Sequence, residues 1–297
     1  MKKILLTGIN GQVGHVLKAE LGEYALISLA RDQLDLSNID QIRQVVRELK
    51  PDLIINPAAY TAVDKAESEP ELAHAINALA PQVLAEEAAR LDAALIHFST
   101  DYVFDGTKLG AYEETDAVNP ISVYGKTKLA GENAIRVVGL PHLILRTSWV
   151  YGVYGKNFLK TIIRLATERE SLSIVADQIG APTSSESIAD ALVKLVNVWN
   201  PNQSDLTGIY HLTNLNTTSW HGFSSEIIRQ YTKLAVNHNW PALKLQEIAA
   251  ITTAEYPTPA VRPANSVLNN AKLFEQFGVK LPTWQDGLRQ VMQQIKI

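Results

Sequence analysis

Apolar and polar positions along the first half of the chain follow a repeated order of strand and helix. Short apolar runs, typical of strands buried on both faces, occupy residues 3–7, 26–29, 52–56 and 94–98. Apolar residues at helical spacing occupy the segments between them, at residues 16–21, 39–49 and 71–91. Strands that alternate with helices predict an α/β fold with a Rossmann-type, doubly wound parallel sheet.

The second half of the chain predicts a smaller and discontinuous α/β lobe. Helical spacing recurs at residues 157–168, 187–199 and 220–233, and a last helix begins near residue 284. Short apolar runs at residues 173–175 and 209–212 predict strands. We expect residues 1–150, with about 186–213, to form the main domain. Residues 151–185 and 214–297 then form the second lobe.

Composition narrows the classes of function. The 297 residues are 46% hydrophobic and 20% charged, and the net charge of −4 offers no basic field for nucleic acid. The chain has no cysteine, which excludes disulfides, thiolate catalysis and cysteine-based zinc sites. No apolar run approaches the ~20 residues that span a bilayer. We expect a cytoplasmic protein that binds neither nucleic acid nor membrane.

A glycine-rich loop joins the first predicted strand to the first predicted helix. It reads Gly8-Ile9-Asn10-Gly11-Gln12-Val13-Gly14. Glycines allow the backbone to approach phosphates, and the following helix N-terminus supplies free N–H groups. The loop therefore predicts the pyrophosphate cradle of a dinucleotide-binding domain, against the alternative of a plain structural turn.

The residues after the second predicted strand bear on the choice of cofactor. Asp32 can bond ribose hydroxyls, whereas Arg31 can accommodate a 2′-phosphate. Asp35 and Leu36 follow, where they can flank the adenine. Arg31 favours NADPH, with NADH possible, and the alternative for Arg31 is a solvated surface charge.

Tyr124 and Lys128 are four residues apart, so on a helix they share one face. Free tyrosine has a pKa near 10. An ammonium group about 4 Å away would favour the phenolate by roughly 4 kcal/mol, or about three pKa units before desolvation. We therefore expect Lys128 to bring the pKa of Tyr124 towards 7 and Tyr124 to donate a proton to a carbonyl. The alternative is a solvated pair at the start of a surface helix.

Hydroxyl and carboxyl groups follow the strand at residues 94–98. Ligands of open parallel sheets bind beyond these carboxyl ends. Thr100 is therefore expected to bond a substrate carbonyl, although hydroxyls at such positions also serve as caps and in turns.

Together these motifs resemble the extended short-chain dehydrogenase/reductases and, within them, the dTDP-4-dehydrorhamnose reductase family. The resemblance covers nearly the whole chain and rests on the glycine loop, Ser99-Thr100-Asp101-Tyr102-Val103-Phe104-Asp105-Gly106, Tyr124-Gly-Lys-Thr-Lys128, Arg146-Thr147-Ser148-Trp149, Gln178-x-Gly180 and Arg262-Pro263. It implies NAD(P)H-dependent reduction of the 4-keto group of dTDP-4-dehydro-L-rhamnose. Tyr124 would be the proton donor, Lys128 would hold the nicotinamide ribose, and Thr100 would orient the keto oxygen.

The resemblance also implies contacts to cofactor and substrate. The expected cofactor contacts are Gly8, Asn10, Gly11, Gln12, Val13, Arg31, Asp35, Leu36, Ala58, Ala59, Tyr60, Tyr124 and Lys128. The expected substrate contacts are Thr100, Asp101, Trp149 and Arg262. Arg262 would meet the pyrophosphate of the nucleotide sugar, against the alternative of a structural salt bridge. Trp220 and Trp284 are expected in the core.

Two further features separate related functions. Some family members hold magnesium at a dimer contact through acidic side chains, but His15 departs from that pattern, so we predict no metal and a monomer or homodimer. Tyr102 stands where related dehydratases carry a glutamate, which argues against dehydration. Another nucleotide-sugar 4-ketoreductase or epimerase remains an alternative, as does a non-catalytic regulatory subunit of this fold.

Overall fold

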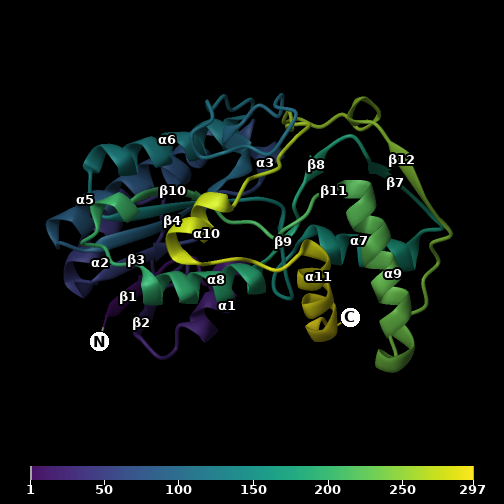
Figure 1. Ribbon diagram of the computed structural model, residues 1–297, viewed down its shortest axis with the longest axis horizontal. Coiled ribbons are helices and arrows are strands. Elements are labelled where there is room, and N and C mark those ends of the chain that lie inside the picture. The colour runs from purple at the N-terminus through teal and green to yellow at the C-terminus, as the bar shows by residue number, and fades with distance from the viewer. Residues whose placement is uncertain (1, 297) are drawn as a thin grey trace.

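A six-stranded parallel sheet forms the centre of the larger domain in the computed structural model, which describes residues 2–296 (Figure 1). The strand order is β10-β5-β4-β3-β1-β2, and every neighbouring pair is parallel. The strands are β1 (Lys3–Leu6), β2 (Ala25–Ser28), β3 (Leu53–Asn56), β4 (Ala94–Thr100), β5 (His142–Thr147) and β10 (Gly208–His211). The predicted doubly wound α/β fold is confirmed.

Helices cover both faces of this sheet because successive strand residues point to opposite sides. Ile4 and Leu6 belong to the hydrophobic cluster beneath α1 (Gln12–Glu20) and α8 (Ser185–Val198). Leu5, between them, belongs to the cluster on the other face, with residues of α2 (Ile39–Leu49) and α5 (Ala80–Arg90). Strands buried on both sides explain the continuous apolar runs in the sequence.

Helix α6 (Val123–Val138) carries Tyr124 and Lys128 on the second face of the sheet. It begins where the Ser122 hydroxyl accepts a hydrogen bond from the Gly125 N–H, and it ends at Gly139, whose φ is 78°. Both are strong helix-boundary signals, because one satisfies a free N–H and the other needs a left-handed backbone. The predicted placement of Tyr124 and Lys128 on one helix is confirmed.

The predicted continuous helix at residues 71–91 is wrong at one turn. The structure has α4 (Pro70–His74), a π-helical turn η1 (Ala75–Leu79) and then α5. The wider turn places Asn77 so that its Oδ1 accepts from the Tyr60 N–H at 2.8 Å and its Nδ2 donates to the Tyr60 carbonyl at 3.1 Å. A π turn often marks a functional site, and here it fixes the backbone after β3.

The second lobe has its own core, which includes Tyr151, Phe223, Tyr231, Trp284 and Met292. It is built from α7 (Phe158–Glu168), α9 (Trp220–His238), α11 (Trp284–Gln294), the parallel pair β7 (Ser171–Val175) and β12 (Glu247–Ile251), and the antiparallel pair β8 (Ile179–Gly180) and β11 (Thr218–Ser219). The Ser219 hydroxyl caps α9, as its sequence position predicts. Short elements complete the chain: α3 (Val63–Ala66), η2 (Asp101–Val103), β6 (Val150–Tyr151), β9 (Thr183–Ser184), η3 (Ser204–Leu206) and η4 (Thr253–Glu255).

Part of the C-terminal segment returns to the main sheet. Helix α10 (Ala271–Phe277) lies beside the sheet in Figure 1, before the chain turns back into α11. Leu273, Val279 and Leu281 join the cluster beneath α1 and α8. The two lobes are therefore interleaved more closely than the predicted boundary at residue 214 describes.

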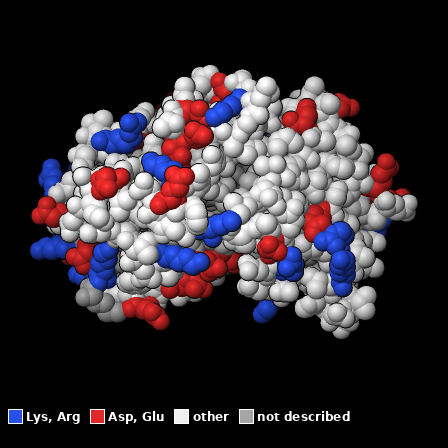
Figure 2. All heavy atoms as spheres, viewed as in Figure 1, with Lys and Arg blue, Asp and Glu red and all other residues white. Residues whose placement is uncertain are grey.

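The surface carries charges of both signs. Figure 2 shows basic and acidic side chains interspersed on the face in view, which is indented along its lower edge between the two lobes. No helix within residues 2–296 is both long and apolar enough to cross a membrane.

Candidate active site

A cleft of about 700 Å³ opens beyond the carboxyl ends of the central strands. This is the position at which open parallel sheets bind ligands. Nearly all of the predicted site residues line it: Gly8, Asn10, Gly11, Gln12, Val13, Arg31, Asp35, Leu36, Ala58, Ala59, Thr100, Asp101, Tyr124, Lys128 and Trp149. The tertiary structure thus brings together residues from six separate stretches of the chain.

The glycine loop can exist only without side chains at two of its positions. Gly8 has a φ of +64°, and a Cβ there would lie 2.7 Å from the Ala58 Cβ. A Cβ on Gly14 would lie 2.3 Å from the Gly8 carbonyl oxygen. Helix α1 begins after Gly11 without a side-chain cap, which leaves its first N–H groups available to a ligand. This cradle fits the pyrophosphate of a dinucleotide.

The far end of the cleft, after β2, holds Arg31 and Asp35. The Arg31 side chain is exposed and forms no salt bridge within residues 2–296. Asp35 accepts hydrogen bonds from the backbone N–H and hydroxyl of Ser37, which lower the pKa of its carboxyl. Tyr60 is placed differently from the other predicted cofactor contacts. Its hydroxyl donates to Glu69 at 2.6 Å, and it is not among the residues that line the cleft.

Tyr124 keeps its proton in this structure. The pKa of Tyr124 is raised to about 12, mainly by burial; the Thr100 hydroxyl opposes this rise and the Asp101 carboxylate adds to it. The predicted downward shift of this pKa by Lys128 is wrong here. Desolvation dominates, and the ammonium group of Lys128 is engaged elsewhere. A protonated phenol is nevertheless the form that a proton donor needs.

Lys128 is buried beneath the cleft floor. Its Nζ donates to the Phe98 carbonyl at 2.6 Å and lies 3.1 Å from Nε2 of His97. Burial lowers the pKa of Lys128 to about 8, and the Glu132 carboxylate opposes that shift. The ammonium form therefore predominates at neutral pH.

A row of buried polar side chains connects Lys128 to the glycine loop. The His97 Nδ1 lies 3.1 Å from the side-chain amide of Asn56, and Asn56 accepts from the Thr7 hydroxyl at 2.6 Å. These residues come from β4, β3 and the end of β1, and each is at most 2% exposed. The row couples the position of the ammonium group to that of the cradle.

Thr100 ends β4 and serves both as a cap and as a cleft-lining hydroxyl. Its Oγ1 accepts from the Tyr102 N–H at 3.1 Å and donates to Asp101 Oδ1 at 2.8 Å. The two interpretations from the sequence, capping and substrate binding, are therefore compatible. To donate to a keto oxygen, the Thr100 hydroxyl must turn away from Asp101.

Asp101 is 2% exposed, and its Oδ2 has no hydrogen-bond partner within the described residues. Burial raises the pKa of Asp101 from 3.8 to about 6, against the neighbouring Ser266 and Thr100 hydroxyls, which lower it. A buried oxygen without a partner, facing a cleft, is suited to accept a hydrogen bond from a bound hydroxyl group.

The pH dependence of stability should report this carboxyl. Because the folded-state pKa lies above the unfolded value, the folded protein binds more protons between about pH 4 and 6. Its unfolding free energy should therefore fall as pH rises through that window, by up to about 3 kcal/mol from this group. Asp101→Asn should remove that loss. Urea unfolding of the parent protein and the variant at pH 4.5 and 7 measures this fall in unfolding free energy. The same pH dependence in both proteins would contradict its attribution to Asp101.

Two stacked indoles stand between the cofactor cleft and the second lobe. Trp149 and Trp220 lie 3.6 Å apart at an interplanar angle of 9°. Trp149 has a φ of +48°, and a Cβ on Gly180 would lie 2.6 Å from its ring. Trp220 packs against the second core, as predicted, and also lines both clefts, which was not predicted. Trp284 is buried in the second core as predicted.

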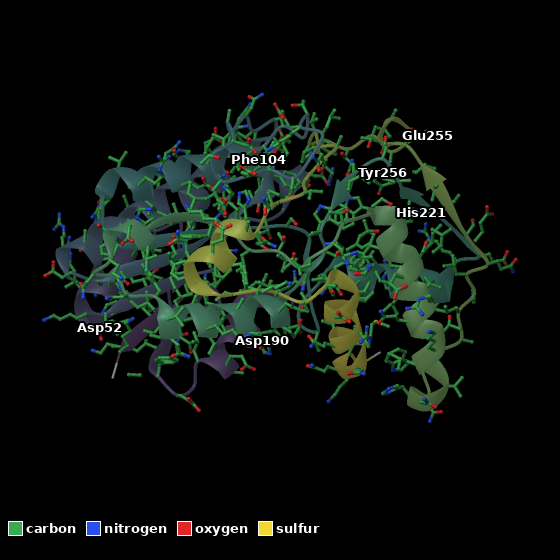
Figure 3. All side chains as sticks on the ribbon, viewed as in Figure 1. Asp52, Phe104, Asp190, His221, Glu255 and Tyr256 are labelled. Atoms are coloured by element: carbon green, nitrogen blue, oxygen red, sulfur yellow. The ribbon has the colours of Figure 1, made fainter. Side chains whose placement is uncertain are left out.

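A second cleft, of about 1030 Å³, continues from the first at Thr61, Tyr102 and Trp220. Arg262 lines this second cleft, and its guanidinium donates to both carboxylate oxygens of Asp64, at 3.1 and 2.8 Å. The salt bridge named as the alternative for Arg262 is thus present. Glu255 and Tyr256 also line this cleft; Figure 3 labels them on the segment that follows β12.

Sequence reasoning missed several residues of the site. Tyr102 was used only to argue against a dehydratase, yet it lines both clefts and packs edge-to-face on Tyr124 at 5.4 Å. Lys156 and Asn157 line the cofactor cleft although they follow the glycine loop by more than 140 residues. No local pattern marks them, because only folding brings them to the loop.

Comparison with known proteins agrees with this geometry. The family model described as the RmlD substrate binding domain matches residues 1–297. A dTDP-4-dehydrorhamnose reductase from Burkholderia thailandensis is 46% identical over 95% of both chains. The chain belongs to the dTDP-4-dehydrorhamnose reductase family. A family member from Salmonella typhimurium is 44% identical over 97% of this chain and 96% of its own.

A solved structure of the family carries its cofactor. The dTDP-4-dehydrorhamnose reductase from Bacillus anthracis, in complex with NADP, is 38% identical and superimposes with a TM-score of 0.88. The alignment covers 99% of this chain and 100% of that one. Members of the dTDP-4-dehydrorhamnose reductase family thus share this two-lobed arrangement over their whole length.

Proposed function

We propose that this protein reduces the 4-keto group of dTDP-4-dehydro-L-rhamnose to give dTDP-L-rhamnose, with NADPH as the preferred reductant and NADH as a possible one. The observation that carries the proposal is the convergence of Tyr124, Thr100 and Lys128 beside the glycine cradle in one cleft. The names of relatives at 44–46% identity support the substrate. The NADP complex of a relative at 38% identity supports the cofactor.

The chain's own residues account for proton transfer and orientation. When bound, NADPH supplies the hydride. Tyr124, protonated at neutral pH, donates its phenolic proton to the oxygen at C4 as negative charge develops there. Thr100 turns its hydroxyl from Asp101 to the same oxygen, and this hydrogen bond strengthens with that charge. Lys128, held by Phe98 and His97, supplies a fixed positive charge below the nicotinamide ribose.

The second cleft offers room for the nucleotide portion of the substrate. It joins the catalytic cleft at Trp220 and Tyr102, so a sugar at Tyr124 would leave its nucleotide in the second cleft. Arg262 supplies positive charge there, although it must share that charge with Asp64. We keep Arg262 as the proposed pyrophosphate contact and Trp149 and Asp101 as proposed sugar contacts.

A dehydratase would need an additional acid–base pair in the catalytic cleft, and Glu113 and Glu114 do not supply it. Glu113 and Glu114 lie in the loop before α6, and neither lines the catalytic cleft. Glu114 instead accepts a hydrogen bond from the His211 N–H at 2.8 Å. A reductase needs no such pair, because Tyr124 is its only required proton donor.

An assay with purified protein tests the proposal. We expect NADPH oxidation with dTDP-4-dehydro-L-rhamnose and none with the matching GDP-linked keto-sugars. Tight retention of NAD⁺ without net turnover would favour an epimerase, and cofactor binding without any turnover would favour a regulatory subunit. Light scattering on the same sample tests the prediction of a monomer or homodimer.

A further inference from the structure

Residues 152–157, which we name the strap, cross from β6 to α7 over the N-terminus of α1. Gln12, the first residue of α1, contacts both this segment and the strand before it. Its Oε1 accepts from Asn157 Nδ2 at 3.0 Å, and its Nε2 donates to the Val150 carbonyl at 3.3 Å. A Cβ on Gly155 would lie 3.3 Å from the Gln12 Cγ. The strap thus lies directly against the glycine cradle.

Two further contacts hold the strap to the main domain. The rings of Tyr154 and His15 stack at 3.6 Å and are parallel within 1°. The Val153 N–H donates to Glu186 of α8 at 3.1 Å. The strap therefore has a defined position over α1, although it follows the predicted end of the dinucleotide-binding domain.

Lys156 lies between Gly155 and Asn157, the two strap residues that contact Gln12. Its side chain is exposed, lines the cofactor cleft and forms no salt bridge within residues 2–296. The other basic residues that line this cleft are Arg31, after β2, and Lys128, which is bound to Phe98 and His97. Lys156 is therefore the cation placed beside the cradle, where a pyrophosphate brings two negative charges.

We propose that Lys156 is a cofactor-binding residue whose ammonium group pairs with the pyrophosphate held by the glycine loop. This inference rests on the proposed function, because it requires a dinucleotide in the cradle. The backbone N–H groups of α1 bond the phosphate oxygens from one side, and Lys156 adds a charge-assisted hydrogen bond from the other. Arg31 serves a different group, the 2′-phosphate, at the far end of the cleft.

Equilibrium binding of NADPH and NADH, followed by nucleotide fluorescence, separates these roles. Lys156→Met should weaken both cofactors by the same factor, about tenfold, and the loss should shrink at high salt. Lys156→Arg keeps the charge and should bind within about threefold of the parent protein. Lys160→Met, one turn into α7 and outside the cleft lining, is the matched control and should bind like the parent. Arg31→Met should weaken NADPH more than NADH.

Each outcome bears on the proposal. Equal affinities of the Lys156→Met and Lys160→Met variants would overturn it, and so would a loss confined to NADPH, which would assign Lys156 to the 2′-phosphate. Hydrogen exchange at residues 152–158 should slow when NADPH binds the parent protein. Unchanged exchange would contradict the proposed contact between the strap and the cofactor. If the parent protein binds neither cofactor, the proposed function itself fails, which is a separate result.

Discussion

Tyr124→Phe should lower kcat at least a hundredfold, equivalent to about 2.7 kcal/mol, while NADPH still binds. The variant keeps the ring and its edge-to-face packing with Tyr102 but removes the phenolic proton that Tyr124 would donate to the substrate. Without that proton, the developing alkoxide must take one from water. Steady-state turnover and cofactor affinity, measured on the same preparation, separate the loss of chemistry from a loss of binding.

Tyr102→Phe is the matched control for this prediction. Tyr102 is the other phenol in the catalytic cleft, and burial raises the pKa of Tyr102 even further above its ordinary value. We expect its loss to lower kcat less than tenfold, because Tyr124, and not Tyr102, shares a helix face with Lys128. A larger loss for Tyr102→Phe than for Tyr124→Phe would transfer the role of proton donor to Tyr102.

Glu132→Ala should lower the unfolding free energy by about 3–5 kcal/mol. Glu132 on α6 and Arg146 on β5 form a bidentate pair at 2.9 and 2.7 Å, and their side chains are 1% and 2% exposed. Removing the carboxylate leaves a buried guanidinium, whose Nη1 already lacks a partner among the described residues, without its paired counter-charge. It also removes the acceptor of the Ser99 hydroxyl below the cleft floor. Urea unfolding followed by circular dichroism measures the loss.

Glu168→Ala provides the comparison for the buried pair. Glu168 bonds Arg164 at 2.7 Å, but their side chains are 50% and 60% exposed. Water already solvates such a pair, so its loss should change the unfolding free energy by less than about 1 kcal/mol. If Glu132→Ala and Glu168→Ala lowered the unfolding free energy by similar amounts, burial would not determine how much the Glu132–Arg146 pair contributes to stability.

The local physics of the chain explains which features could be predicted. Strands β1, β3 and β4 are buried on both faces, so their apolar runs were recognisable from the sequence. The glycine loop was recognisable because Gly8 and Gly14 have no space for a Cβ. Helix α6 has a serine cap and a terminal glycine, which locate Tyr124 and Lys128 in its first turns. Each of these features has a signature of a few consecutive residues, even where its cause, such as Ala58 beside Gly8, lies elsewhere in the chain.

The sequence by itself determined the fold class, the glycine loop and the candidate residues of the reaction, because these depend on periodicity, on steric limits and on motifs of a few residues. Only the tertiary structure decided how those residues behave. It buried Tyr124, so that desolvation outweighs the expected effect of Lys128 on its pKa. It introduced the π turn at Asn77, placed Trp220 in the cleft and brought Lys156 to the glycine loop. These features leave no local pattern, because they depend on packing between segments far apart in the chain.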